Sequence, residues 1–191
     1  MIMPKLLGLG GKKRHGKDEF AKGLGDDWVI VGMAEPLYDL VLTDNNYIGV
    51  DDQGNLIRVA DFLAQYNNDW VEAKKHPEIR RMLQVKGTES GRKMFGENVW
   101  VDKMLDTARK HLDSGKNVAV TGIRFPNEAQ AIRDAGGTLV WVERPNFEED
   151  KDSNSGHASE NSVTYQDFDM VVANNSTLDA LYQKAHDLFN N

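Results

Sequence analysis

Short apolar runs alternate with amphipathic stretches along most of the chain. Five runs rich in Val, Ile and Leu are typical of strands buried on both faces: Lys5–Gly10, Trp28–Met33, Asn117–Thr121, Thr138–Glu143 and Phe168–Ala173. Helical spacing or helix-boundary residues mark the stretches between them: Asp18–Leu24, Glu35–Leu42, Val59–Tyr66, Glu78–Lys86, Val99–Leu112, Asn127–Ala135 and Leu178–Phe189. This alternation predicts an α/β fold, with a five-stranded parallel sheet covered by helices on both faces.

Two regions interrupt the alternation. Residues 36–98 hold no clear strand, and Asp44–Arg58 is rich in Asn, Asp and Gly with a turn signal at Asp51–Gly54. We therefore expect a mostly helical insertion beside the sheet. Arg144–Asn161 is polar and has no apolar period, so it is expected to be an exposed loop. The sequence predicts one domain, residues 1–191, that carries both features.

Composition narrows the class of protein. The chain has 191 residues, 40% hydrophobic and 28% charged, which suits one well-buried core. It has no cysteine, which excludes disulfides and thiolate metal sites. The net charge of −7 argues against a nucleic-acid-binding protein, but a local basic cluster can still bind a small anion. No apolar run is long enough to span a membrane, and the first residues do not resemble a signal peptide.

The segment Gly11–Asp18, G-K-K-R-H-G-K-D, matches the phosphate-binding pattern G-x-x-x-x-G-K. Gly11 permits a sharp turn off a strand, and the following amides with the helix N-terminus form an anion nest. Lys17 can reach the β- and γ-phosphates of ATP. The alternative is a glycine-rich turn with a solvated basic patch. We expect the whole segment to bind ATP: Gly11, Lys12, Lys13, Arg14, His15, Gly16, Lys17 and Asp18.

Asp18 stands where Ser or Thr usually ligates Mg²⁺ in this pattern. A carboxylate there can bind Mg²⁺ directly or through water, or it can orient Lys17 at the helix N-terminus. These alternatives stay open, and a Mg²⁺ role for Asp18 is a hypothesis.

Further segments occur in an order that, taken together, is specific. They are Leu83-Gln84, Gly87–Arg92, Asn98–Val101, Ile123–Glu128, His157–Glu160 and Asn174–Leu178. With the loop, they resemble the deoxynucleoside monophosphate kinases of tailed bacteriophages. The resemblance implies a P-loop three-layer sandwich that converts ATP and a deoxynucleoside monophosphate into ADP and the diphosphate, with Mg²⁺. It also implies that residues 36–98 bind the acceptor, that residues 144–162 form a mobile lid, and that the enzyme acts in a host cytoplasm; some such enzymes are homodimers.

Four cations are the candidate catalytic residues: Lys17, Arg14, Arg124 and Arg144. Phosphoryl transfer needs positioning and charge neutralisation, and the planar guanidinium of arginine binds phosphate oxygens in pairs. Arg124 follows a strand at its carboxyl end, where ligands bind in open parallel sheets. Arg144 opens the expected lid and can reach the phosphoryl group or stack on adenine. Each arginine can instead be an ordinary surface residue.

The resemblance also suggests acceptor contacts in the expected insertion. Arg92 is interpreted as the residue that binds the acceptor phosphate, with Gln84, Glu89, Asn98 and Arg124 as further candidates. Trp70 and Trp100 can stack on a base, although an aromatic at helical spacing is more often core. Asn174 corresponds to a position near adenine, and Ser159 is a candidate N-cap beside His157 and Glu160. His15 is not expected to be a base, because the acceptor phosphate is already ionised.

One departure weakens the metal assignment. Gly122 stands where relatives often carry an Asp that would contact Mg²⁺ or its water, and Asp18 or Glu128 are candidate substitutes. Two alternatives therefore remain. One is another small-molecule kinase, of the phosphomevalonate or dephospho-coenzyme A type, and the other is a nucleotide-binding protein without transferase activity.

Overall fold

The computed structural model describes residues 3–92, 96–145, 147 and 162–190, without the side chains of residues 88–90 and 92. The chain divides into two compact units. We call Met1–Met33 with Val101–Asn191 the sheet unit, and Ala34–Trp100 the insert unit.

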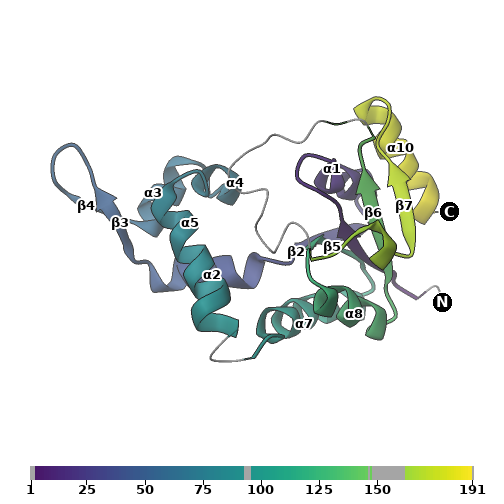
Figure 1. Cartoon of the computed structure of the whole chain (residues 1–191), viewed down its shortest axis with the longest axis horizontal. Helices are drawn as coiled ribbons and strands as arrows, with labels where there is room; N and C mark the ends of the chain where they lie inside the picture. Colours follow the sequence, from purple (N-terminus) through teal and green to yellow (C-terminus); the bar gives the residue numbers. More distant parts are fainter. Residues whose placement is uncertain (1–2, 93–95, 146, 148–161, 191) are drawn as a thin grey trace. The chain divides into compact units, whose positions relative to one another are not determined.

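The sheet unit contains five parallel strands in the order β2-β5-β1-β6-β7 (Figure 1). The strands are β1 (Leu6–Gly10), β2 (Trp28–Gly32), β5 (Asn117–Ile123), β6 (Thr138–Glu143) and β7 (Met170–Ala173). The first strand is therefore central, with β5 on one side and β6 on the other. All five predicted strands are confirmed, and their observed bounds differ from the predicted ones by at most two residues.

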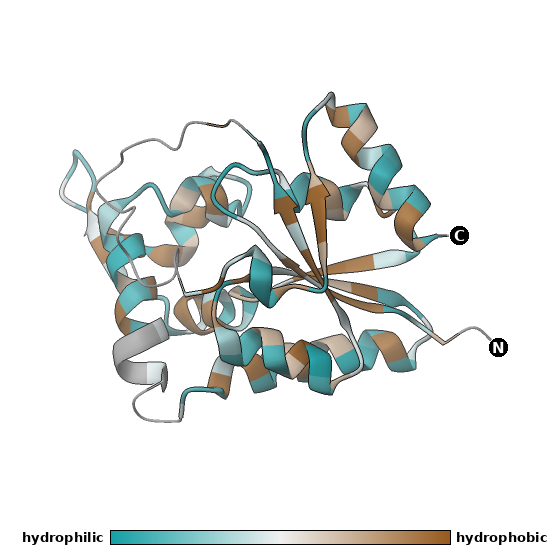
Figure 2. Cartoon of the chain, turned by 45° about the vertical axis from the view of Figure 1, so that its right-hand side comes forward, coloured by the Kyte–Doolittle hydropathy of each residue, from teal (hydrophilic) through white to brown (hydrophobic). Residues whose placement is uncertain are grey.

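Helices cover both faces of this sheet (Figure 1). The helices of the sheet unit are α1 (Lys17–Lys22), α7 (Val99–Asp113), α8 (Pro126–Asp134) and α10 (Leu178–Phe189), with a 3₁₀ turn, η2 (Tyr165–Asp167). Leu139 and Trp141 of β6 pack in the cluster that contains α7 and α8 residues, whereas Val140 packs in the cluster of α1 and α10. Alternate residues of a strand point to opposite faces, so both faces of β6 are buried. Figure 2 shows the hydrophobic colouring along these strands.

The insert unit is built mainly from helices around a small apolar core of its own. Its elements are α2 (Glu35–Asp44), β3 (Tyr47–Val50), β4 (Leu56–Arg58), α3 (Val59–Gln65), α4 (Trp70–Ala73), α5 (Pro77–Gln84) and a π-helical stretch, η1 (Val85–Arg92). Buried residues of α2, α3 and α5 form the core, including Val41, Leu63 and Ile79. An ion pair between Lys86 and Asp44 also links η1 to α2 within this unit.

The expectation that residues 36–98 contain no strand is wrong. Strands β3 and β4 pair as an antiparallel hairpin around the turn signal at Asp51–Gly54. The Asp51 carboxylate accepts the backbone N–H groups of Gln53 and Asn55 at 2.9 and 2.8 Å, which closes the turn. The hydropathy pattern does not predict these two strands, because they are short and mostly exposed and show no apolar alternation.

No helix within the described ranges is long and apolar enough to cross a membrane.

Candidate functional site

The predicted phosphate-binding segment lies between the central strand and the first helix of the sheet unit. β1 ends at Gly10 and α1 begins at Lys17, so Gly11–Gly16 forms the connecting loop. Gly11 has φ 147° and Gly16 has φ 95°, values that side-chain-bearing residues adopt only under strain. Gly16 is also the N-cap of α1, so the loop delivers the chain directly to a helix N-terminus, where backbone N–H groups are available to an anion.

Both glycines also lie close to neighbouring segments, Gly11 to a backbone atom and Gly16 to a side-chain atom. A Cβ on Gly11 would lie 2.5 Å from the carbonyl oxygen of Val142, in the neighbouring strand β6. A Cβ on Gly16 would lie 2.6 Å from Nδ2 of Asn174, just after β7. The backbone of the loop is therefore held close to two other strand ends.

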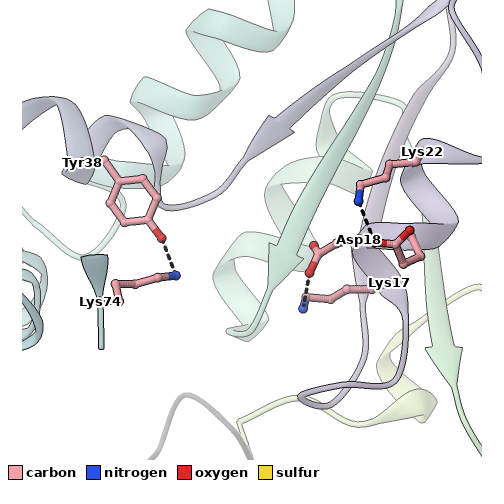
Figure 3. Close-up of polar contacts among 6 residues, drawn as sticks. Lys17, Asp18, Lys22, Tyr38 and Lys74 are labelled. Atoms are coloured by element: carbon pink, nitrogen blue, oxygen red, sulfur yellow. Dashed lines mark hydrogen bonds and ion pairs between the residues drawn. The ribbon is translucent and has the colours of Figure 1, made fainter. Parts of the chain in front are cut away.

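Lys17 is the first residue of α1, and its side chain is 14% exposed. Its Nζ lies 3.2 Å from Oδ2 of Asp18, whose side chain is 64% exposed (Figure 3). The Lys17 side chain is thus largely covered, whereas its partner is open to solvent. Lys17 begins α1, where backbone N–H groups are also available to an anion.

A polar link fixes α1 to the C-terminal helix. Glu19 accepts hydrogen bonds from Lys22 Nζ and from the Tyr182 hydroxyl on α10, each at 2.6 Å. The bond from Lys22, followed by that from Tyr182, lowers the pKa of Glu19 below its ordinary value. The helix that follows the phosphate loop is thus tied to a second element of the sheet unit.

This link predicts a pH-dependent contribution to stability. Because its pKa is lowered by folding, Glu19 stabilises the protein above its unfolded pKa, and this contribution is lost as pH falls through the folded value. In urea unfolding between about pH 3 and 7, Glu19→Gln should be less stable than the wild type near neutrality, and the difference should shrink in acid. Tyr182→Phe, which removes one donor, should show part of the same trend. A difference for Glu19→Gln that stays constant with pH would refute it.

Three adjacent parallel strands are each followed, at their carboxyl ends, by a segment that contains Lys or Arg. The order β5-β1-β6 places Arg124 after β5, the loop with Arg14 and Lys17 after β1, and Arg144 after β6. Parallel strands end at one edge, so these four predicted catalytic residues all follow strand ends there. Four cationic residues therefore follow strand ends at one edge of the sheet.

Glu128 has a structural task at this edge. Its side chain is buried, and Oε2 accepts the backbone N–H groups of Arg124 at 2.8 Å and Phe125 at 3.2 Å. With Pro126 in the first turn, these bonds start α8 immediately after β5. Glu128 therefore holds the backbone of Arg124 in place.

The backbone conformation at position 122 favours glycine. Its φ is 87°, and the pairing of β1 with β5 shifts register here, from Leu9 opposite Thr121 to Gly10 opposite Ile123. This bulge places the residue in a conformation that an Asp would adopt only with strain. Gly122 thus lies at an irregularity in the pairing of β5 with β1.

The structure assigns Asn174 a contact that sequence reasoning missed. Its Nδ2 donates to the carbonyl oxygen of His15 at 3.1 Å, and its backbone N–H donates to Glu143 at 2.7 Å. Asn174 therefore supports the loop Gly11–Gly16, and its expected position near adenine stays a prediction. Residues 15 and 174 are far apart in sequence, and no local pattern signals their contact.

The expected acceptor residues fall in the insert unit, except Arg124. Gln84 ends α5 and is exposed, and Asn98 is exposed just before α7. Glu89 and Arg92 lie on η1. π-helical geometry is rare in proteins and is frequent at functional sites, so η1 is a distinctive feature of the segment that the resemblance singled out.

The two tryptophans of the insert unit make internal contacts. Trp70 stacks on Tyr38, with ring centroids 4.7 Å apart, and Tyr38 also accepts a hydrogen bond from Lys74 (Figure 3). Trp100 is 7% exposed, and its indole N–H donates to the carbonyl oxygen of Gly87 at 2.9 Å. A Cβ on Gly91 would lie 2.4 Å from the Trp100 ring. Trp100 thus packs against η1, and an additional contact with an acceptor base stays a prediction.

Most of the predicted lid, including His157, Ser159 and Glu160, lies outside the described residues.

The family of this chain is identified by a match that does not include the loop Gly11–Gly16. A family model described as deoxynucleotide monophosphate kinase matches residues 33–185. The deoxynucleotide monophosphate kinase of Enterobacteria phage T4 is 27% identical over 128 residues, covering 66% of this chain and 48% of that protein. This chain thus spans about half the length of the T4 relative. A protein of Acanthamoeba polyphaga mimivirus, assigned the same activity provisionally in its name, is 25% identical and covers 94% of this chain and 93% of its own length.

Solved structures support the fold. A sugar kinase from Janibacter sp. HTCC2649 superposes with a TM-score of 0.51 at 11% identity, covering 98% of this chain and 95% of its own. Dephospho-CoA kinase from Campylobacter jejuni gives 0.51 at 13% identity, covering 99% and 97%. Together with the five-stranded parallel sheet, these matches confirm the predicted P-loop kinase fold. By its family match over residues 33–185, the chain belongs to the deoxynucleotide monophosphate kinase family.

Proposed function

We propose that this chain transfers the γ-phosphoryl group of ATP to a deoxynucleoside monophosphate, which gives ADP and the deoxynucleoside diphosphate. The observation that carries the proposal is the loop Gly11–Gly16, placed between the central strand and the N-terminus of α1. The family match supports the acceptor class and depends on residues 33–185, which lie outside the loop. The two arguments therefore use separate parts of the chain.

In this proposal the loop and the cations around it bind the phosphates. Backbone N–H groups from Gly11 to Lys17 face the β- and γ-phosphates, and the Lys17 ammonium neutralises charge that develops during transfer. Lys12, Lys13 and His15 complete the ATP-binding loop with Arg14. Arg124 and Arg144 contribute from the two neighbouring strand ends. The protein then accelerates transfer by positioning and charge stabilisation, without a covalent intermediate.

The proposed acceptor residues are Gln84, Glu89, Arg92, Asn98, Trp100 and Arg124. Arg92 binds the acceptor phosphate, because a guanidinium pairs with two phosphate oxygens at once. The acceptor phosphate is ionised at neutral pH and attacks without a general base. The proposal also includes the assignment of residues 36–98 as the acceptor-binding insertion and of residues 144–162 as the lid.

Magnesium fits this site through a single carboxylate. Within the described parts of the chain, no three His, Asp or Glu side chains gather as a metal cluster. Mg²⁺ in kinases usually keeps several waters and takes substrate phosphates with only one or two carboxylates, so a cluster is not required. Asp18 is exposed beside Lys17 and is available for this role, whereas Glu128 is engaged in holding the start of α8. Asp18 would hold the ion, which neutralises phosphate charge when bound.

A substrate panel tests the proposal. Purified protein is mixed with ATP and Mg²⁺ and with each deoxy- and ribonucleoside monophosphate, mevalonate 5-phosphate or dephospho-coenzyme A, and ADP release is measured. The proposal expects ADP release that depends on one or more deoxynucleoside monophosphates. Transfer only to a non-nucleotide acceptor would instead assign the chain to another small-molecule kinase type. ATP binding without acceptor-dependent ADP release would indicate a non-catalytic nucleotide-binding protein.

The role of Arg92 makes a separate prediction. Arg92→Ala should raise the KM for the acceptor by about tenfold or more while changing the KM for ATP little, because an arginine–phosphate contact contributes about 1.5–3 kcal/mol. Arg81→Ala is the matched control, since Arg81 lies on α5 of the same unit and is paired with Glu78. Initial-rate kinetics with both substrates varied would measure the effect. Equal changes in both KM values would remove Arg92 from the acceptor site.

Action in a host cytoplasm, assembly into a homodimer and the absence of nucleic-acid partners stay predictions. Gel filtration with light scattering would test the homodimer directly.

A further inference from the structure

His15 is buried in the phosphate loop and is bonded to the ends of two other strands. It is 5% exposed and lies between Arg14 and Gly16. Its ring atom Nδ1 accepts the backbone N–H of Arg144, just after β6, at 3.1 Å. Its carbonyl oxygen accepts Nδ2 of Asn174, just after β7, at 3.1 Å. One residue of the loop therefore joins the segments that follow β1, β6 and β7.

The bond to Arg144 fixes the state of the imidazole ring. A ring nitrogen can accept a hydrogen bond only when it carries no proton, so His15 is the neutral tautomer with its proton on Nε2. A neutral ring adds no charge to the phosphate site. The contribution of His15 is therefore geometric, and it differs from that of the neighbouring Lys12, Lys13 and Arg14.

His15 and the side chain of Arg144 are also linked indirectly, because both contact the ring of Phe147. The His15 ring meets Phe147 edge to face, with centroids 5.8 Å apart and planes at 81°. The guanidinium carbon of Arg144 lies 5.1 Å from the centroid of the same Phe147 ring. Stacking on an aromatic ring restricts where a guanidinium can go. His15 thus contacts the main chain of Arg144 directly and its side chain through Phe147.

We propose that His15 is a positioning residue that holds Arg144 in register with the phosphate loop. The inference rests on the proposed function, in which Arg144 and Lys17 act on the same phosphates. Arg144 is exposed and follows the last residue of β6, and the contact described for its long side chain is with Phe147, whose ring also meets His15. A displacement of about 1 Å in a catalytic group can reduce the rate about a hundredfold. The hydrogen bond from Arg144 to His15 opposes this displacement directly, and the contact through Phe147 adds to it.

Two substitutions distinguish the effect of the hydrogen bond to Arg144 from the effect of having any polar side chain at position 15. In His15→Asn, the amide oxygen can occupy nearly the place of Nδ1 and accept the Arg144 N–H. In His15→Gln, the longer side chain places its oxygen near the position of Nε2 and leaves the Arg144 N–H without its acceptor. We expect kcat to fall by about threefold or less in His15→Asn and by about tenfold or more in His15→Gln, with the acceptor KM nearly unchanged in both.

A double-mutant cycle tests whether His15 acts through Arg144. If it does, His15→Gln should reduce kcat much less in an Arg144→Ala background than in the wild type, because the group that it positions is already absent. Additive losses, or an equal loss in His15→Asn and His15→Gln at equal melting temperatures, would overturn the inference. If the melting temperatures of the variants differ, kcat is compared at a temperature below the thermal transition of the least stable variant, where all variants are folded.

A readout that needs no turnover separates this inference from the proposed function. Hydrogen exchange of the Arg144 amide, followed by NMR, should be slow in the wild type and in His15→Asn and at least about tenfold faster in His15→Gln. Wild-type protein that transfers phosphate to no deoxynucleoside monophosphate would refute the proposed function, and exchange would still test the link. Equally fast exchange in all three proteins would refute the link itself.

Discussion

Lys17→Ala is expected to lower kcat for phosphoryl transfer by about a hundredfold or more while leaving the protein folded. Removing one preorganised charge or donor from a transition state costs about 10²–10³ in kcat. The Lys17 side chain is largely covered, but it belongs to neither apolar cluster of the sheet unit, so its removal should leave the core intact. Steady-state kinetics would measure the loss, and circular dichroism with thermal melting would verify the fold.

Lys22→Ala is the matched control for this prediction. Lys22 is the last residue of the same short helix, and its ammonium group is paired with Glu19. Its removal should leave kcat within about twofold of the wild type, since an exposed ion pair contributes little. If folded Lys17→Ala retains near-normal kcat, or if both variants lose activity equally, Lys17 does not have the assigned role.

Gly11→Ala is expected to weaken ATP binding by about tenfold or more and to destabilise the sheet unit. The new methyl group would lie 2.5 Å from the carbonyl oxygen of Val142, a backbone atom of β6 that cannot move without disturbing the sheet. Overpacking of this kind costs about 1–3 kcal/mol. Because the loop must shift away from β6, its amides would no longer converge on one anion. Calorimetric titration with ATP and urea unfolding would measure the two effects.

Gly49→Ala separates this clash from backbone strain. Gly49 has φ 159°, close to the 147° of Gly11, but a Cβ there meets nothing within 4 Å. It lies on the hairpin of the insert unit, so its replacement should cost stability through strain alone and leave ATP affinity unchanged. Equal losses of ATP affinity in the two variants, or normal ATP affinity in folded Gly11→Ala, would contradict the loop assignment.

The sheet could be predicted from sequence because its strands are buried on both faces. The run Leu139–Val142 is uninterruptedly apolar, and the predicted bounds Thr138–Glu143 coincide with those of β6. The loop between β1 and α1 could be predicted because its pattern is local: two glycines and a lysine at fixed spacing, between a strand and a helix. Its binding of phosphate stays a prediction.

The rest of the site depends on contacts between distant residues. The bonds from Arg144 and Asn174 to His15 span 129 and 159 residues, and no periodicity encodes them. The hairpin of the insert unit was missed for a different reason. β3 and β4 are short and mostly exposed, so burial does not impose an apolar pattern on them. Glu128 was considered for the metal, but a capping role depends on the backbone geometry that precedes α8.

The most direct test of the central claim is a crystal structure of the protein with Mg²⁺ and a non-hydrolysable ATP analogue. The account predicts β- and γ-phosphate oxygens within about 3.2 Å of backbone nitrogens between Gly11 and Lys17, with the Lys17 ammonium group on the same phosphates. A triphosphate bound elsewhere on the chain, with the loop making no contact to it, would contradict the account.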